Sequence, residues 1–194
     1  SENDGDESWP SDTPDRQLEL GLAGYTTVHA YERNVNPLGA PRFDFKNSDA
    51  SVLIANLKFT PALAANVVDA ARNADTLFDL VGTRGDGQVE DDRQIDEITF
   101  EWIADSWEYL TLNEEERLAG KINVNTASRA VLETVPRMNA DMADAIVGHR
   151  SSQGAFSGLG RLYRSNVLTR RQFERVAGFL TVRSNVFRVV SEGR

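Results

Sequence analysis

The sequence contains an internal repeat with an offset of 79 residues. Apolar and polar residues alternate over 43–46 and again over 122–125, and each stretch is followed by apolar residues at helical spacing. The same offset superimposes three pairs of apolar dipeptides: Val52-Leu53 on Val131-Leu132, Leu63-Ala64 on Met142-Ala143, and Val67-Val68 on Ile146-Val147. Each copy is therefore predicted to form an extended entry, a helix, a short hairpin and a second helix.

The predicted helices carry start signals and small residues. The polar residues 47–49 provide oxygens that can cap the first helix of copy one, and Thr126 provides one in copy two. The second helices, predicted over 61–72 and 140–150, place alanines beside aliphatic residues, which lets neighbouring helices approach closely. Trp102 lies on the apolar stripe of a further helix, and we predict a core position for it.

The two copies also end alike, in a helix that runs into an extended exit, over 100–112 in the first copy and 173–182 in the second. The first copy is longer because it contains the loop 82–92, which is rich in glycine and acidic residues. β-Branched and aromatic residues predict one strand over 24–32 and another over 184–191. We expect these two strands to pair.

Charge is distributed unevenly along the chain. Its 194 residues include 21 Lys and Arg and 30 Asp and Glu, a net charge of -9. Residues 1–120 hold 9 basic and 25 acidic residues, a net of -16, whereas residues 121–194 hold 12 and 5, a net of +7. The total argues against a uniformly basic surface for nucleic acid, but it leaves room for a basic patch on the second copy.

The residue types exclude several kinds of site. The chain has no cysteine, which removes disulfides, thiol catalysis and cysteine-ligated zinc. His29 and His149 are too few for a multi-histidine metal site, and we expect His149 to have a surface or capping role at the end of its helix. No serine motif of the nucleophile-elbow kind is present, and nothing distinguishes one pair of carboxylates for acid and base catalysis. We therefore do not expect an enzyme.

The acidic loop offers hard oxygen ligands beside two glycines, a composition that suits calcium. The candidate ligands are Asp86, Glu90, Asp91 and Asp92. The loop lacks the alternating aspartates of an EF-hand, so a solvated acidic loop is the preferred interpretation and calcium the alternative.

The motif over 122–127, with sequence INVNTA, resembles two known groups of proteins, and the resemblance continues at Leu132, Pro136, Ala143, Ile146 and Arg150. One group is the competence DNA receptor type. The other is the minor pseudopilin K of type II secretion systems, where a helical region carrying N-x-N-T-A is inserted into a pilin-like sheet. Both contain helix-hairpin-helix or SAM-like modules. The resemblance covers most of 24–190 and is specific over 121–150.

The patterns and the resemblance together predict an α+β fold that is mainly α. Two tandem helix-hairpin-helix or SAM-like repeats are expected, flanked by a few short β-strands. Along the chain we predict an acidic flexible tail, a strand with the first repeat, the second repeat and a C-terminal strand, over 1–20, 21–112, 113–183 and 184–194. No window approaches the ~20 apolar residues that span a bilayer, and we expect a soluble fragment or a processed product that starts at Ser1.

The hairpins separate the two groups. In the DNA-binding form, hairpin glycines let backbone amides approach a phosphate closely. Arg137 and Asn139 occupy these places in the second copy, and Lys58 and Thr60 occupy them in the first. Because arginine is a poor replacement for a glycine with positive φ, we do not expect the main chain to hold a phosphate.

Nucleic acid remains the alternative partner because the second copy is rich in arginine. In this interpretation Arg137, Asn139 and Arg150 are the candidate contacts to the phosphate backbone. The same arginines also suit a solvated face, or a surface that meets an acidic neighbour in an assembly. We favour the assembly interpretation because the hairpin glycines are absent.

The resemblance to minor pseudopilin K implies a non-enzymatic assembly subunit. Such a subunit caps or initiates a periplasmic pseudopilus together with other minor pseudopilins. It is anchored to the inner membrane by an N-terminal helix that is absent from this chain. Relatives of this kind are known to bind calcium, which raises the expectation for the acidic loop; no other cofactor is implied. The alternatives are a helix-hairpin-helix DNA-binding protein and a hydrolase with unrecognised carboxylates.

Overall fold

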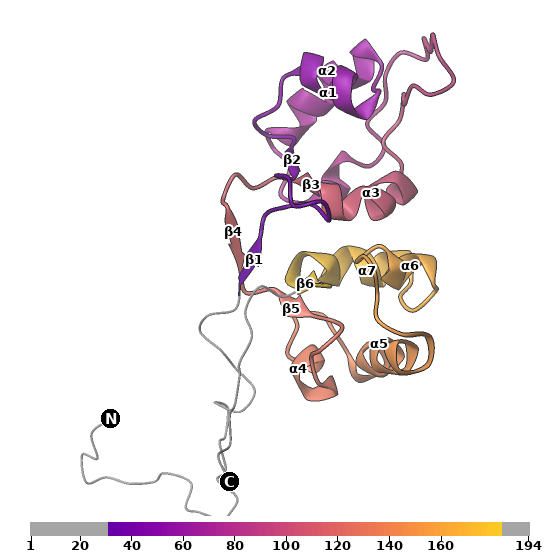
Figure 1. The fold of residues 1–194 in the computed structure, drawn as a ribbon. Helices are drawn as coiled ribbons and strands as arrows, with labels where there is room; N and C mark the ends of the chain where they lie inside the picture. Colours follow the sequence, from indigo (N-terminus) through magenta and orange to yellow (C-terminus); the bar gives the residue numbers. More distant parts are fainter. Residues whose placement is uncertain (1–30, 184–194) are drawn as a thin grey trace, which may run out of the picture. The chain divides into compact units, whose positions relative to one another are not determined.

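The computed structural model describes residues 31–183. The predicted tail at 1–20, most of the predicted strand at 24–32 and the predicted strand at 184–191 lie outside this range. The described part contains seven α-helices and three two-stranded sheets, so the fold is of the predicted α+β, mainly helical class (Figure 1).

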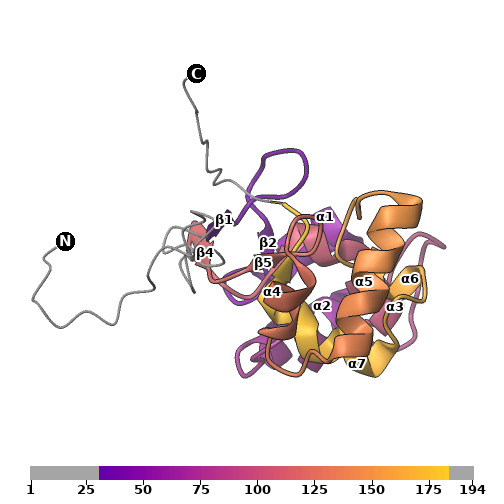
Figure 2. The same cartoon turned by 90° about the horizontal axis from the view of Figure 1, so that it is seen from below.

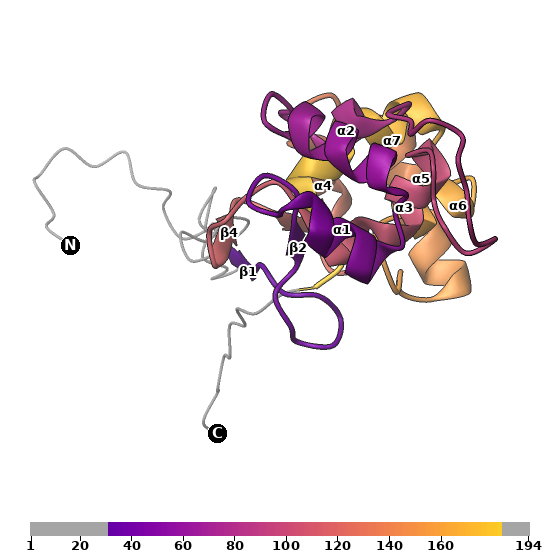
Figure 3. The same cartoon turned by 90° about the horizontal axis from the view of Figure 1, so that it is seen from above.

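The first repeat is enclosed by two strands that pair in parallel, β2 (Phe43–Asp44) and β3 (Leu110–Thr111). Between them lie the helices α1 (Ala50–Leu57), α2 (Pro61–Ala71) and α3 (Phe100–Ser106), and the 3-10 turns η2 (Leu77–Leu80) and η3 (Trp107–Tyr109). Figure 3 shows α1 and α2 side by side. Asp49 is the N-cap of α1, but its side chain makes no capping hydrogen bond. The predicted entry, helix, hairpin and helix are therefore present in this order.

The second repeat has the same plan. Its elements are β5 (Ile122–Asn123), α4 (Arg129–Glu133), α5 (Ala140–Gln153), α6 (Arg161–Arg164), α7 (Arg170–Val176), the 3-10 turn η4 (Ala177–Phe179) and β6 (Leu180–Thr181). Again the entry strand and the exit strand, β5 and β6, pair in parallel. Figure 2 shows α4 and α5 side by side. The offset of the sequence repeat thus corresponds to a repeat in the fold.

Two predicted helix limits in the second repeat are wrong. The first helix begins later than expected because the amides of Thr126 and Ala127 both donate to the Asn123 carbonyl oxygen in a turn. The N-cap is Ser128 rather than Thr126, and its hydroxyl oxygen accepts from the Val131 amide at 3.3 Å. At the other end, α5 continues past 150 and stops before Gly154, whose φ of 89° lies in the left-handed region.

A third sheet pairs two strands that lie on either side of the first repeat in the sequence. Strand β1 (Tyr31–Arg33) runs antiparallel to β4 (Arg117–Ala119), with Tyr31 opposite Ala119. The whole of the first repeat therefore forms an insertion between two paired strands.

Each repeat has its own apolar core, and α3 contributes to both. Ile103 is buried in the first core, whereas Phe100 and Ala104 of the same helix are buried in the second. The Phe100 ring lies with its centroid 4.8 Å from that of Tyr163 and 6.2 Å from that of Phe173. The predicted core position of Trp102 is a partly buried one, packed against the first core. Because α3 is shared, the two repeats pack as one body.

Candidate functional site: the hairpins and the cleft between the repeats

The two hairpins have the same backbone conformation. Lys58 and Arg137, which the repeat places in equivalent positions, both adopt the left-handed region, with φ values of 61° and 67°. Both positions therefore adopt the glycine-like conformation although arginine is a poor replacement for glycine there. Each costs about 1–2 kcal/mol of backbone strain, and Phe59 and Val135 beside the hairpins are buried.

The helix N-termini behind the hairpins are poorly suited to hold a phosphate. Helix α2 begins at Pro61, which has no N–H, and the Thr60 hydroxyl oxygen accepts from the Leu63 amide at 3.2 Å. In α5 the Asn139 side-chain oxygen accepts from the Met142 amide at 2.9 Å, and Asp141 places a negative charge in the first turn. These features oppose anion binding at both hairpins.

The three residues predicted as nucleic-acid contacts do not form one surface. Arg137 is exposed at the hairpin, and Asn139 next to it caps α5. Arg150 lies three helical turns further along α5, about 16 Å from Asn139 at the usual rise. Its Nη1 donates to the Val124 carbonyl oxygen at 2.6 Å. Arg150 therefore holds the entry strand of the second repeat to α5.

Several arginines of the second repeat are paired with carboxylates. The pairs are Arg129 with Asp144 and Glu133, Arg164 with Asp105, Arg170 with Glu174, and Arg183 with Glu108. Hydrogen bonding to Asp144 raises the pKa of Arg129, and hydrogen bonding to Asp105 raises the pKa of Arg164. The positive charge counted in the sequence is thus partly neutralised within the fold.

A tyrosine and a carboxylate also connect the two repeats. The Tyr163 hydroxyl donates to Glu101 Oε1 at 3.0 Å. The pKa of Glu101 is lowered, first by a hydrogen bond from its own backbone and then by the bond from Tyr163. The same contact raises the pKa of Tyr163. The pair lies on the contact between α3 and α6.

The acidic loop does not gather its carboxylates. Asp86 Oδ1 accepts from the Gln88 amide at 3.1 Å, and Asp91 Oδ1 accepts from the Arg93 amide at 3.0 Å. Within residues 31–183, no three His, Asp or Glu side chains are arranged so that they could hold a metal ion. Calcium binding by Asp86, Glu90, Asp91 and Asp92 stays a prediction without support from this geometry.

Asp96, which no sequence pattern indicates, connects this loop to the first hairpin. Its Oδ1 accepts from the Thr60 hydroxyl at 2.5 Å, and its Oδ2 accepts from the Gly87 amide at 2.8 Å. The partners are 36 and 9 residues away in the sequence, so no local pattern indicates them.

His149 does not end its helix. It lies inside α5, and its ring stacks on Phe156 with the centroids 4.7 Å apart. The capping role predicted for it is wrong because α5 continues to Gln153.

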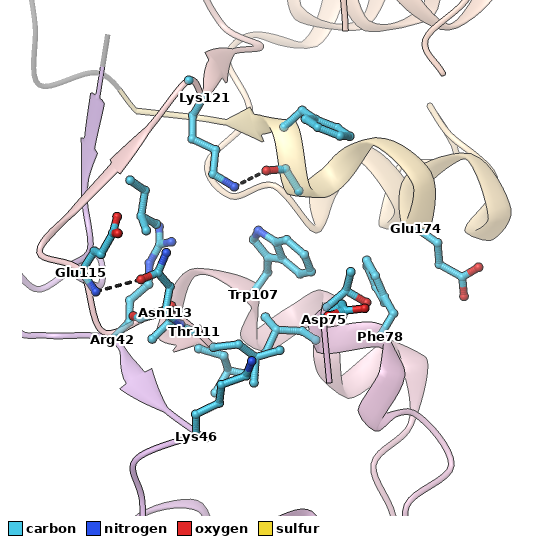
Figure 4. A pocket seen from close by; sticks show the side chains of 18 of the residues that line it. Arg42, Lys46, Asp75, Phe78, Trp107, Thr111, Asn113, Glu115, Lys121 and Glu174 are labelled. Carbon is cyan, nitrogen blue, oxygen red and sulfur yellow. Dashed lines mark hydrogen bonds between the residues drawn. The ribbon is translucent and has the colours of Figure 1, made fainter. Parts of the chain in front are cut away.

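A cleft of about 690 Å³ lies where the repeats meet (Figure 4). Phe78, Trp107 and Leu118 contribute apolar surface to it, and Lys121 reaches across one side to donate from Nζ to the Gly178 carbonyl oxygen. Burial lowers the pKa of Lys121, and the nearby carboxylates of Glu32 and Glu108 partly oppose this effect. Segments far apart in the sequence build the cleft, so sequence reasoning missed it. Its lining residues include no histidine that could transfer a proton near neutral pH.

Comparison with known proteins finds a family match for the second repeat. Residues 118–181 match the family described as the helix-hairpin-helix motif. The second repeat contains a helix-hairpin-helix motif. Two uncharacterized proteins of Neisseria meningitidis, one from serogroup A and one from serogroup B, are each 36% identical to this chain over 61 residues. The aligned segment is 31% of this chain and spans 8% of the length of each relative. No solved structure matches the chain significantly.

Proposed function

We propose that this chain is the water-exposed region of an assembly subunit of the minor pseudopilin K type in a type II secretion system. The observation that carries the proposal is the pairing of β1 with β4, which makes the first helical repeat an insertion between paired strands. A helical region inserted into a sheet is the arrangement that the resemblance implies.

The chain also returns to the strand pair after the second repeat. Arg183, which follows β6, donates to the carbonyl oxygens of Val35 and Asn36 at 3.3 and 3.2 Å. Both residues lie shortly after the end of β1, so the entry to the helical repeats and the exit from them lie together. This closeness supports an inserted helical region with both connections at the same edge.

In the proposed role the protein is not an enzyme. Its helical repeats cap or initiate a pseudopilus, its partners are other minor pseudopilins, and its place is the periplasmic side of the inner membrane. In the full-length protein an apolar helix before Ser1 provides the anchor. Within residues 31–183, no helix is long and apolar enough to cross a membrane.

Copurification and secretion test this role together. The full-length protein with an affinity tag is expressed from its own gene, and detergent extracts are purified and probed for the other minor pseudopilins of the organism. We expect these proteins to copurify, and deletion of the gene to abolish secretion of type II substrates. Normal secretion in the deletion strain, with no minor pseudopilin bound to the tagged protein, refutes the proposal.

A DNA-binding role is the second candidate, favoured by the helix-hairpin-helix match and by the left-handed conformation of Arg137. Fluorescence anisotropy with duplex DNA over a salt series tests it, because phosphate contacts make affinity strongly salt-dependent. Arg137→Glu is the test variant, and Arg93→Glu, at an exposed position next to the acidic loop, is the matched control. We expect no salt-sensitive binding. Binding that Arg137→Glu removes and Arg93→Glu retains replaces the assembly proposal with the DNA-binding one.

A further inference from the structure

The β1–β4 pair meets the helical repeats through a buried ion pair. Leu118 of β4 is buried, but it belongs to neither of the two apolar cores. Glu32 of β1 is also buried, at 4% exposure, and its carboxylate pairs with the Arg42 guanidinium. Because Glu32 and Leu118 belong to neither core, exposing them leaves the residues of both cores buried.

Glu108 is the centre of this polar attachment. It lies in η3 at 7% exposure and accepts from three groups that come from different parts of the fold. Its Oε1 accepts from the Leu159 amide at 3.0 Å, and its Oε2 accepts from Arg183 at 2.9 Å and from Arg42 at 3.4 Å. One carboxylate thus connects the second repeat, the chain after β6 and the segment that follows β1. We call Glu32, Arg42, Glu108 and Arg183 the Glu108 cluster.

The polar network at this junction is incompletely satisfied. Among the buried side-chain nitrogen and oxygen atoms of residues 31–183, two lack a hydrogen-bond partner, Arg42 Nε and Asn34 Oδ1. Arg42 belongs to the Glu108 cluster, and Asn34 follows β1 and donates from Nδ2 to the Asn113 carbonyl oxygen at 2.7 Å. Unpaired buried polar groups destabilise the closed arrangement because opening would return them to water. Both such atoms lie where the strand pair meets the repeats.

We propose that the Glu108 cluster is a latch that opens while both cores stay folded, so that the β1–β4 pair moves as a unit relative to the helical repeats. In the closed state Glu108 holds Arg42 and Arg183 together. Loss of its charge removes one ion-pair partner from each arginine and raises the population of the open state. The latch follows from the contacts alone and does not depend on the proposed function.

Distance measurements between two spin labels test the latch. The chain has no cysteine, so Arg33→Cys on β1 and Gln153→Cys on α5 give unique labelling sites at exposed positions. Pulsed electron paramagnetic resonance should show one narrow distance distribution in the wild-type background. We expect Glu108→Gln to add a second distance population. The control, Asp105→Asn, removes an exposed pair with Arg164 on α3 and α6 and should leave the distribution narrow.

Amide hydrogen exchange distinguishes latch opening from general destabilisation. In Glu108→Gln, we expect the Leu159 and Arg42 amides, which donate to Glu108 and to the Asn34 carbonyl oxygen, to exchange at least tenfold faster. The Ala64 and Ala143 amides in the helices should keep their wild-type rates. An unchanged distance distribution overturns the proposal, and so does equal acceleration at all four amides. If Glu108→Gln does not fold, the distance measurement is made on Arg183→Gln instead, because this variant leaves the bond between Glu108 and Leu159 in place. A wild-type distance distribution in that variant also overturns the proposal.

Discussion

Gly160→Ala tests the packing of the two repeats because Gly160 sits where α6 begins against the end of α3. A Cβ atom built at this position would lie 2.0 Å from the carbonyl oxygen of Ala104 and 2.7 Å from its carbonyl carbon. Close carbon–oxygen contacts in proteins are about 3.3 Å or longer, so α6 has to move by roughly 1.3 Å. The obstacle is backbone rather than a flexible side chain, and a change of rotamer does not relieve it.

The expected cost follows from two opposing effects. Overpacking of a well-packed contact costs about 1–3 kcal/mol, and a backbone clash of this size belongs at the upper end. Gly160 has φ -58° and ψ -18°, which alanine adopts without strain, so reduced entropy of the unfolded chain returns about 0.4–1 kcal/mol. The net loss is about 2 kcal/mol, which lowers the melting temperature by about 4–8 °C for a chain of this length.

Gly148→Ala is the matched control. Gly148 lies inside α5, and a Cβ atom added there meets nothing within 4 Å. Alanine in a helix interior is favoured over glycine by about 0.5–1 kcal/mol, so this variant should melt a few degrees above wild type. Both variants are compared by differential scanning calorimetry and by urea unfolding. A Gly160→Ala protein as stable as wild type refutes the close contact between α3 and α6 and, with it, the packing of the repeats as one body.

Three further predictions concern strain and titration. Arg137→Gly removes about 1–2 kcal/mol of left-handed backbone strain, whereas the greater entropy of the unfolded glycine chain costs about 0.5–1 kcal/mol. Urea unfolding should therefore show a free energy of unfolding that is higher than wild type by about 0.5–1 kcal/mol. Arg137→Ala keeps the strain and should show no such increase. Burial lowers the pKa of Lys121 below its ordinary 10.5. Between the folded-state pKa and pH 10.5, the unfolded chain therefore binds more protons than the folded chain. The free energy of unfolding of wild type should therefore rise relative to Lys121→Met between the folded-state pKa and pH 10.5, and parallel curves contradict the burial of the amine. The lowered pKa of Glu101 gives stability that is present above pH 4.5 and lost as pH falls through the folded-state value, so the deficit of Glu101→Gln relative to wild type should shrink between pH 7 and pH 3. A deficit of equal size at both pH values contradicts the contribution of the Glu101 charge.

The repeat was predictable because its signals are local. The matching apolar dipeptides place the buried residues of α2 and α5, and alternation over a few residues places the entry strands β2 and β5. The exits β3 and β6 follow from the second pair of matching segments, and they pair with the entries as closing strands. Agreement between two copies strengthens each local pattern, since an accidental periodicity does not return at the same offset.

The hairpins and the polar junction were not predictable for the opposite reason. The left-handed conformation of Lys58 depends on bonds to a distant segment, because the Ile95 amide donates to the Lys58 carbonyl oxygen at 2.8 Å. In the same way, Glu108 meets Leu159 across 51 residues and Arg183 across 75. Residue propensities alone predict a right-handed or extended backbone for Lys58 and an exposed position for Glu108. Tertiary contacts reverse both assignments.

In the fold, part of the uneven charge of the sequence lies in contacts between the two repeats. The acidic first part and the basic second part suggested either a nucleic-acid surface or a dipole that docks onto a neighbour. In the structure, carboxylates of the first repeat meet arginines and a tyrosine beyond it in the chain: Asp105 with Arg164, Glu108 with Arg183, and Glu101 with Tyr163. The exposed pair of Asp105 and Arg164 contributes little to stability, and its effect is to fix how the two surfaces meet. We infer that part of the charge asymmetry serves the contact between the repeats, which leaves less positive surface for an external polyanion than the count of arginines implies.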